Sequence, residues 1–300
     1  MARPVPAAPP PAPVAQRLVI RYAKRGRMRF ASHRDIARAI ERGVRRAGLP
    51  VAFSAGFSPH PKISYAGGAP TGAASEAEYL EIALTGACPA PDVRDRLDAA
   101  LPDGIDVIEV VELAEGPGGV GALRLEGSQW RVLLPGVGAG EAARAVQAFL
   151  AAESIVVERL TSKGLRRLDA RAAVLTLELD RRAEQEAGAG DAVLHLVVRH
   201  VTPAVRPDDI LAALSKVAAL EPSSPPLVTR LAQGPLSVQA GTRSARDDAA
   251  VARASALRRG SQGRRRRGRW RQSQRPGRPA WPRPEDRKQK HAWDRRAPQR

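Results

Sequence analysis

The strand and helix patterns in the first half of this sequence return in the same order in its second half. Alternating apolar residues, typical of strands, and apolar stripes, typical of helices, follow one another as β-α-β-β-β-α-β between residues 17 and 113. The same order recurs between residues 129 and 233. It is an elaborated split β-α-β pattern. The sequence therefore predicts an α+β protein made of two tandem split-βαβ (ferredoxin-like) domains.

The helix pattern in residues 32–50 has the clearest local signals. Ser32 and Asp35 have the spacing of a capping box, and Gly48 followed by Pro50 is a stop signal. Further helices are expected over residues 91–100, 141–152 and 206–218. Strands are expected over residues 17–23, 51–53, 62–66, 76–84, 105–113, 129–136, 154–160, 172–180, 192–201 and 227–233.

Changes in composition divide the chain into five segments. A literal G-x-G-x-x-G in the middle segment is followed by a strand pattern instead of a helix, which favours a linker over a dinucleotide site. The predicted segments are a disordered Pro/Ala-rich stretch (1–15), an N-terminal α+β domain (16–113), a linker (114–127), a C-terminal α+β domain (128–239) and a disordered Arg-rich tail (240–300).

The net charge of +18 is concentrated in the tail. Residues 241–300 hold 20 basic and 5 acidic side chains, whereas residues 1–240 hold 29 basic and 26 acidic ones. Arginine runs interleaved with Trp270, Trp281 and Trp293 could bind RNA through phosphate contacts and stacking. The alternative is a poorly constrained extension that owes its composition to a GC-rich genome. The sequence leaves both interpretations open.

Cysteine and hydropathy patterns exclude several classes of protein. The single cysteine excludes an internal disulfide, and it also excludes a cysteine-ligated iron–sulfur cluster or a multi-cysteine zinc site within one chain. No stretch approaches the roughly 18 apolar residues of a membrane span. We therefore expect a cytoplasmic protein that neither enters a membrane nor holds a metal ion.

The helix expected over residues 32–50 carries two stripes. Its apolar stripe is formed by Ile36, Ile40, Val44 and Ala47. Four arginines repeat the same spacing two residues earlier, about 200° around the helix, so they should form a basic stripe on the opposite face. These arginines are Arg34, Arg38, Arg42 and Arg45.

The stretch FSAGFSPHPKISY, residues 53–65, combines a stiff backbone with many polar groups. Its two prolines restrict the chain, and its glycine permits a tight turn. A structural turn would explain the glycine and the prolines, whereas a site would also explain the polar side chains. Together with the start of the preceding helix, this loop is predicted to bind a substrate or an anion. The candidate residues are Ser32, His33, Arg34, Arg38, Ser54, Ser58, His60 and Lys62.

Several motifs spread over residues 16–234 resemble those of one bacterial family. They are K-x-G-x-x-R-F at Lys24–Phe30, S-H at Ser32–His33, E-R at Glu41–Arg42, S-x-G-F-x-P-H-P-K at Ser54–Lys62, and the runs LRRLDAR, AVRPDDIL and TRLAQG. In these motifs the chain resembles the radical SAM-associated protein family, whose members occur beside a radical SAM protein or fused to its C-terminus.

The resemblance implies a context for this chain, and no specific reaction. A radical SAM enzyme needs three cluster-binding cysteines, so the iron–sulfur cluster and S-adenosylmethionine would be held by a partner chain, with no cofactor in this one. The family's neighbourhoods imply a substrate linked to RNA or ribonucleoprotein. Two functions remain open: a non-catalytic substrate-binding partner of the radical SAM enzyme, or an RNA-modifying or RNA-processing enzyme that uses His60 and Lys62. No catalytic residue can be assigned.

Overall fold

The computed structural model describes residues 12–113, 120, 123–162, 164–180 and 190–236. The Arg-rich tail, residues 1–11 of the Pro/Ala-rich stretch and most of the predicted linker lie outside the described residues. The predictions made for those segments therefore stay predictions.

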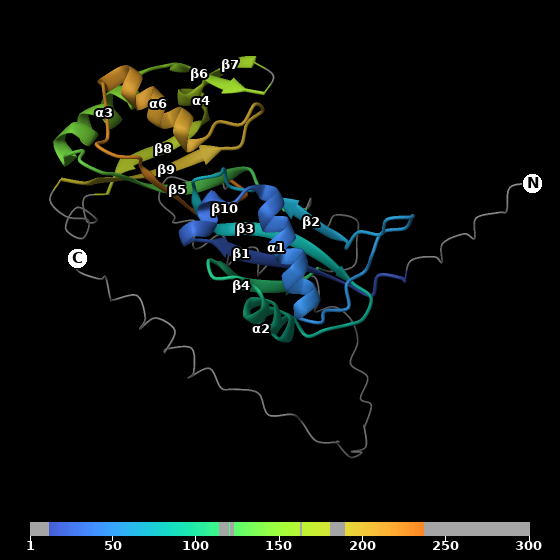
Figure 1. Cartoon of the computed structure of the whole chain (residues 1–300). Coiled ribbons are helices and arrows are strands. Elements are labelled where there is room, and N and C mark those ends of the chain that lie inside the picture. The colour runs from blue at the N-terminus through green and yellow to red at the C-terminus, as the bar shows by residue number, and fades with distance from the viewer. Residues whose placement is uncertain (1–11, 114–119, 121–122, 163, 181–189, 237–300) are drawn as a thin grey trace, which may run out of the picture. The chain divides into compact units, whose positions relative to one another are not determined.

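The described residues form a mixed α/β structure around a mainly antiparallel sheet (Figure 1). Within them the sheet has eight strands, seven of which follow the order β4-β1-β3-β10-β5-β9-β8, while β2 pairs with β3. The pairing of β10 with β3 is parallel, and the other pairings in this sheet are antiparallel. A separate two-stranded sheet joins β6 and β7.

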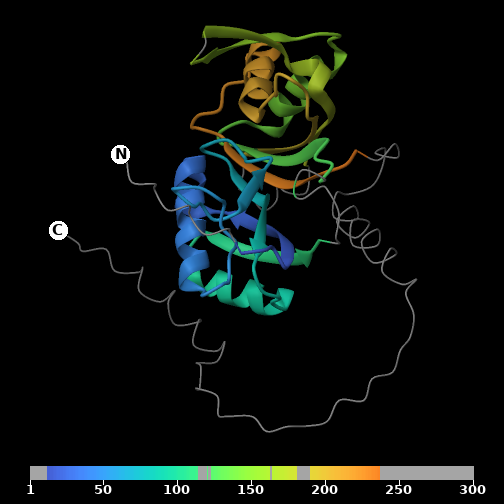
Figure 2. The ribbon, with the colours of Figure 1, turned by 90° about the vertical axis from the view of Figure 1, so that its right-hand side faces the viewer.

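In the first half of the chain, two helices pack on one face of the strands. The strand order there is β4-β1-β3-β2. Side chains from both helices and from these strands share a single apolar core, and Figure 2 shows α1 lying along one side of the strands. The elements are β1 (Gln16–Lys24), the 3-10 helix η1 (Gly26–Phe30), α1 (His33–Arg46), β2 (Ile63–Ala66), β3 (Ala74–Leu84), α2 (Ala90–Ala100) and β4 (Ile105–Glu112).

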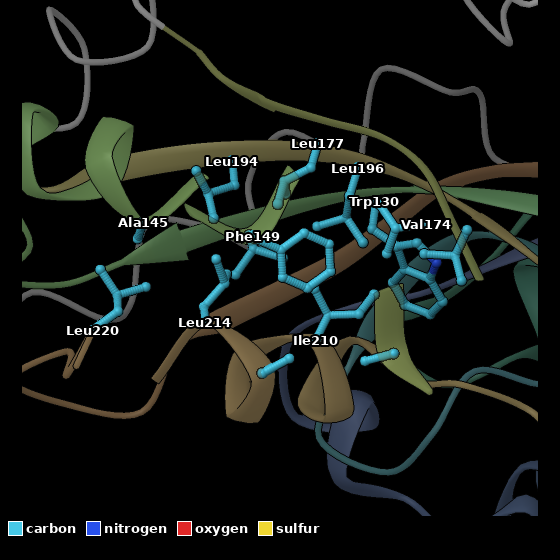
Figure 3. Packing of buried hydrophobic residues seen from close by; sticks show 14 of the residues in the cluster. Trp130, Ala145, Phe149, Val174, Leu177, Leu194, Leu196, Ile210, Leu214 and Leu220 are labelled. Carbon is cyan, nitrogen blue, oxygen red and sulfur yellow. The ribbon is translucent and has the colours of Figure 1, made fainter. Parts of the chain in front are cut away.

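The second half has the strand order β10-β5-β9-β8 and a core of its own. Phe149 is fully buried at the centre of this core, between residues of the strands and of α6 such as Leu194 and Leu214 (Figure 3). The elements are β5 (Gly127–Leu134), α3 (Ala139–Ala151), β6 (Val156–Thr161), β7 (Gly164–Asp169), α4 (Ala170–Ala173), β8 (Val174–Leu179), β9 (Ala192–Arg199), α6 (Pro207–Ala218) and β10 (Leu227–Gly234).

The strands of the two halves meet where β10 pairs with the first residues of β3. Only Thr229 with Ala74 and Arg230 with Ser75 are in register there. Within the linker region, the backbone N–H of Val120 donates a hydrogen bond of 2.6 Å to Glu81 on β3. One sheet thus continues across both halves. The division into two domains at residues 114–127 stays a prediction.

Two expectations differ from the observed elements. Residues 51–53 form only isolated bridges, Val51 with Leu84 and Phe53 with Pro61, because the chain turns away at once into the following loop. The strand expected near residue 156 leaves the main sheet and pairs with β7, which the sequence did not predict. Four of the six β7 residues are exposed, so β7 lacks the apolar alternation by which a strand is recognised.

Candidate nucleic-acid interface

The start of α1 is fixed by the capping box that the sequence predicts. The Ser32 hydroxyl accepts a hydrogen bond from the Asp35 backbone N–H (3.2 Å) and donates one to the Asp35 carboxylate (2.6 Å). The hydrogen bond from the Ser32 hydroxyl to the carboxylate, followed by that from the Ser32 backbone N–H, holds the pKa of Asp35 below its ordinary value. A carboxylate therefore already occupies this helix terminus. A bound anion there would meet a like charge, so the predicted role of Ser32 in anion binding gains no support.

The far end of α1 is fixed by a side chain from α2. The Arg96 guanidinium donates hydrogen bonds to the carbonyls of Ala47 (2.5 and 3.0 Å) and Gly48 (2.8 Å). These are carbonyls that a helix end would otherwise leave without a partner. The apolar face between the two ends is buried, as predicted, through Ile36, Ile40 and Val44. The position of α1 on the sheet is thus set by both caps and by its core face.

The opposite face of α1 carries the four predicted arginines, and all four are exposed. Among the described residues, none of their guanidinium groups forms a hydrogen bond or an ion pair. Two acidic residues of α1 adjoin this stripe in the sequence, Asp35 beside Arg34 and Glu41 beside Arg42, and Arg38 contributes to lowering the pKa of Asp35. The arginine face, defined as Arg34, Arg38, Arg42 and Arg45, is therefore a line of available positive charge on a well-anchored helix.

A second basic element comes directly before α1. The 3-10 helix η1 has arginines in its last turn and no acidic residue in its first. The Arg29 guanidinium carbon lies 4.5 Å from the centre of the Phe30 ring, a cation–π arrangement. The Phe30 side chain is nevertheless 60% exposed. The approach to α1 thus presents an aromatic ring beside arginine side chains.

The loop between α1 and β2 closes on itself, much as the sequence predicts for a stiff segment. The Ser54 backbone N–H donates to the His60 carbonyl (2.8 Å), and the His60 N–H donates to the Ser54 hydroxyl (3.0 Å). The Lys62 N–H donates to the Ala52 carbonyl (2.8 Å). Ser54 is therefore used in closing the loop. The side chains of Ser58, His60 and Lys62 are exposed.

The structure does not join this loop directly to the start of α1. The one ring contact between the two regions is edge-on, between His33 and Tyr65, with ring centres 5.2 Å apart. Lys62 lies three residues before Tyr65 along an extended chain, about 10 Å away. Among the described residues, neither His60 nor Lys62 contacts Ser32 or His33 through a hydrogen bond or ring. The predicted residues thus form two neighbouring groups, and their common site stays a prediction.

Sequence analysis missed a buried polar cluster at the junction of β3 and β10. The Arg230 guanidinium, 3% exposed as a side chain, donates to the Glu78 carboxylate (2.5 Å) and to the Ser75 hydroxyl (3.1 Å). The Gln233 side chain donates to the carbonyls of Ala77 (2.6 Å) and Gly67 (3.1 Å). Arg230 and Gln233 both lie in the run TRLAQG on β10. The sequence could have indicated this cluster only if the pairing of β10 with β3 had been known.

Lys24 belongs to the same junction. Its ammonium group is buried and donates to the carbonyls of Ala69 and Pro70, at 3.2 Å each. Burial lowers its pKa, while the nearby Glu78 acts in the opposite direction. The backbone N–H of Ala69 in turn donates to Glu78. These contacts hold the loop at Gly67–Ala69 against β3, which is a structural role.

Other features of the described residues lie away from the predicted site. No group of three His, Cys, Asp or Glu side chains in the described part of the chain could hold a metal ion. A shallow, largely apolar groove of about 560 Å³ lies between α3 and β8 and includes none of the predicted residues. No described helix is long and apolar enough to cross a membrane.

Fold and surface together define an α/β protein with a mainly antiparallel sheet and an exposed basic helix face. The family model described as "Uncharacterized protein conserved in bacteria (DUF2344)" matches residues 17–207. Because this match covers more than half of the chain, the protein belongs to that family.

Comparison with individual proteins adds little. No curated protein matches the chain. Among solved structures, a chain of the "Crystal Structure of a Cbf5-Nop10-Gar1 Complex" is similar over 74% of this chain, with 12% sequence identity and a TM-score of 0.40. The alignment covers 50% of that chain, so this protein spans half of its length. A likeness of this degree supports no functional conclusion.

Proposed function

We propose that this protein is a non-catalytic partner of a radical SAM enzyme and binds an RNA or ribonucleoprotein substrate through the arginine face of α1. The radical SAM enzyme would be a separate chain that holds the iron–sulfur cluster and S-adenosylmethionine. The motif resemblance from Lys24 to Lys62 supports the choice of partner. We place the assembly in the cytoplasm.

The exposed arginine face is the observation that carries the proposed RNA contact. Four guanidinium groups that form no ion pair with any residue in the described part of the chain lie along one side of a helix whose other side is buried. Arginine contacts phosphates through forked pairs of N–H groups, and a phosphate backbone offers a matching line of negative charge. Because both ends of α1 are capped, the helix would need no rearrangement to bind. The Arg-rich tail would add affinity that does not depend on sequence.

A catalytic role for His60 and Lys62 has less geometric support. A general base or nucleophile is commonly oriented by a neighbouring side chain within hydrogen-bond reach. Among the described residues, neither the His60 ring nor the Lys62 ammonium has such a neighbour. Both side chains are better suited to contact an anionic ligand from the surface.

We also propose that the two halves are two ferredoxin-like units that share one sheet. What supports this is the matching strand order, β4-β1-β3-β2 in the first half and β10-β5-β9-β8 in the second. We number the main-sheet strands of each half in chain order, so that β5, β8, β9 and β10 are the first to fourth strands of the second half. In both halves the strands then lie side by side in the order fourth, first, third, second, as in a split β-α-β unit. The hairpin β6–β7 and α4 would then be an insertion in the second unit.

The RNA contact can be tested with a quadruple variant in which Arg34, Arg38, Arg42 and Arg45 are changed to Gln. We expect this variant of the full chain to bind RNA more weakly. The slope of log affinity against log salt concentration should become less negative by about 3, because each lost phosphate contact on a single strand changes it by roughly 0.7. The melting temperature should change little, because all four side chains are exposed.

A matched control removes the same charge elsewhere. Four exposed arginines of the second half, Arg144, Arg166, Arg167 and Arg199, are changed to Gln in the full chain. The control should keep most of the RNA affinity. Equal losses in both variants would mean that only net charge matters, and the arginine face would not be the contact. Turnover of RNA by the purified chain alone would favour the enzymatic alternative.

A further inference from the structure

We infer that the RNA recognised by this protein is single-stranded, and that Phe57 and Phe30 act as platforms on which unpaired bases stack. This inference rests on the proposed function, because it names the substrate class of the same basic surface. It adds two binding residues outside the arginine face.

The placement of the phenylalanines is the first step. The chain has four phenylalanines, and only Phe149 is fully buried. Phe57 is 90% exposed, Phe30 is 60% exposed and Phe53 is 42% exposed. A phenylalanine in water forgoes the free energy that burial of its ring would give. Three such rings in the half of the chain that carries the arginine face are therefore unexplained by folding.

The rings are held in place by ordered backbone. Phe57 is carried by the loop that the Ser54–His60 hydrogen bonds close, and the Phe53–Pro61 bridge marks the base of this loop. Figure 1 shows the loop extending beyond the start of β2. Phe30 is the last residue of η1 and is separated by two residues from the start of α1. Phe30 thus projects from the segment just before α1, and Phe57 projects from the closed loop that follows it in the chain.

Charge around these rings favours an anionic ligand. Residues 51–75 contain no aspartate or glutamate, and they contain Lys62 and His60. Residues 25–34 also contain no acidic side chain, and they contain four arginines, of which Arg25 is paired with carboxylates of β3 and β4. The rings alone would also fit an apolar pocket on a partner protein. Because the chain segments that carry both rings are basic, an RNA backbone is the better match.

The exposure of the rings selects single strands over duplex. In A-form RNA the bases are stacked in pairs and the major groove is deep and narrow, so a surface ring cannot reach a base face. Unpaired bases can swing out and stack on an aromatic side chain, whatever their identity. The expected ligand is therefore a single-stranded segment whose phosphates follow the arginine face.

The test compares the full chain's affinity for a 12-nucleotide single-stranded RNA and for the blunt duplex of the same sequence. Phe57→Ala and Phe30→Ala should each weaken binding of the single strand by about 5- to 150-fold, the range expected for a lost base stack. Binding of the duplex should not change. Phe57→Trp should retain the affinity, whereas Phe57→Leu, which keeps an apolar side chain without a ring face, should not.

A control variant is Leu165→Ala, which removes an exposed apolar side chain from β7 in the other half. It should leave both affinities as in the wild type. Ultraviolet crosslinking of the bound single strand, followed by mass spectrometry, should mark peptides that contain Phe57 and Phe30. This readout separates these contacts from those of the Arg-rich tail.

The possible failures can be told apart. If single strand and duplex bind equally and the phenylalanine variants bind like the wild type, the stacking inference is wrong while the arginine face is untouched. If the arginine variant also binds as the wild type does, the proposed function fails as well. If Phe57→Ala no longer binds the radical SAM enzyme but binds RNA as the wild type does, the ring contacts a pocket on that protein, and the inference is wrong.

Discussion

Glu76 and Glu78 are two residues apart on β3 and have arginine partners in different surroundings. Glu78 pairs with Arg230 where both side chains are nearly inaccessible, 5% and 3% exposed. Glu76 pairs with Arg25, whose side chain is 47% exposed. Burial lowers the pKa of Arg230, and Glu78 opposes that shift. A buried charge that loses its partner is costly, whereas an exposed pair contributes little.

We therefore expect Glu78→Ala to lower the free energy of unfolding by about 3–5 kcal/mol. Glu76→Ala, the control on the same strand, should lower it by less than about 1 kcal/mol. Urea unfolding measures both values. A double variant, Glu78→Leu with Arg230→Met, should recover much of the loss, because no unpaired charge then remains buried. Equal effects at positions 76 and 78 would show that the buried pair does not hold β3 to β10.

Helix α1 is the element best predicted by the sequence, because its signals are local. Ser32, Asp35 and Gly48 determine its ends within a few residues, and the periodicity of Ile36 and Ile40 determines its buried face. The parallel pairing of β10 with β3 could not be predicted in this way. It joins Arg230 to Ser75, 155 residues earlier in the chain, and depends on a cluster that only the folded sheet brings together.

Local patterns also indicated one part of the candidate site, whereas the other part depends on non-local pairing. The spacing of Arg34 and Arg38 alone indicated an exposed basic face, and they are exposed. The position of the loop at Lys62 relative to α1 depends on how β2 pairs with β3, which local patterns do not determine. Phe57 was overlooked because an apolar residue in a loop sequence gives no sign of whether its ring will be buried.

The capping box of α1 should contribute to the dependence of stability on pH in acid. The pKa of Asp35 is lower in the folded chain than in the unfolded one, where it is about 4. Its stabilising effect is therefore present above pH 4 and is lost as the pH falls below 4. Asp35→Ala should lower the melting temperature at pH 7 and reduce its decline between pH 4 and pH 2.

Thermal unfolding followed by circular dichroism over this pH range measures the effect. The control is Asp92→Ala, which removes an acid from the first turn of α2, a helix without a side-chain cap. If both variants decline in acid as the wild type does, the capping carboxylate does not contribute to the pH dependence.

At the scale of the whole molecule, the proposed role of this chain is to bind and position a substrate while another chain performs the chemistry. The arginine face lies on a helix with fixed ends, and the sheet continues across both halves through a buried polar junction. A basic surface on a helix with both ends capped suits a binding partner. The radical SAM enzyme, by this account, would meet the RNA only through this protein.

The most direct test of that claim is to measure how much RNA the radical SAM enzyme retains, in an affinity pull-down, with and without this protein. We predict that the enzyme retains RNA only when the wild-type chain is present. The variant with Gln at positions 34, 38, 42 and 45 should bind the enzyme as the wild type does but bring much less RNA with it. Equal RNA retention with the variant, or with no added chain, would contradict the account.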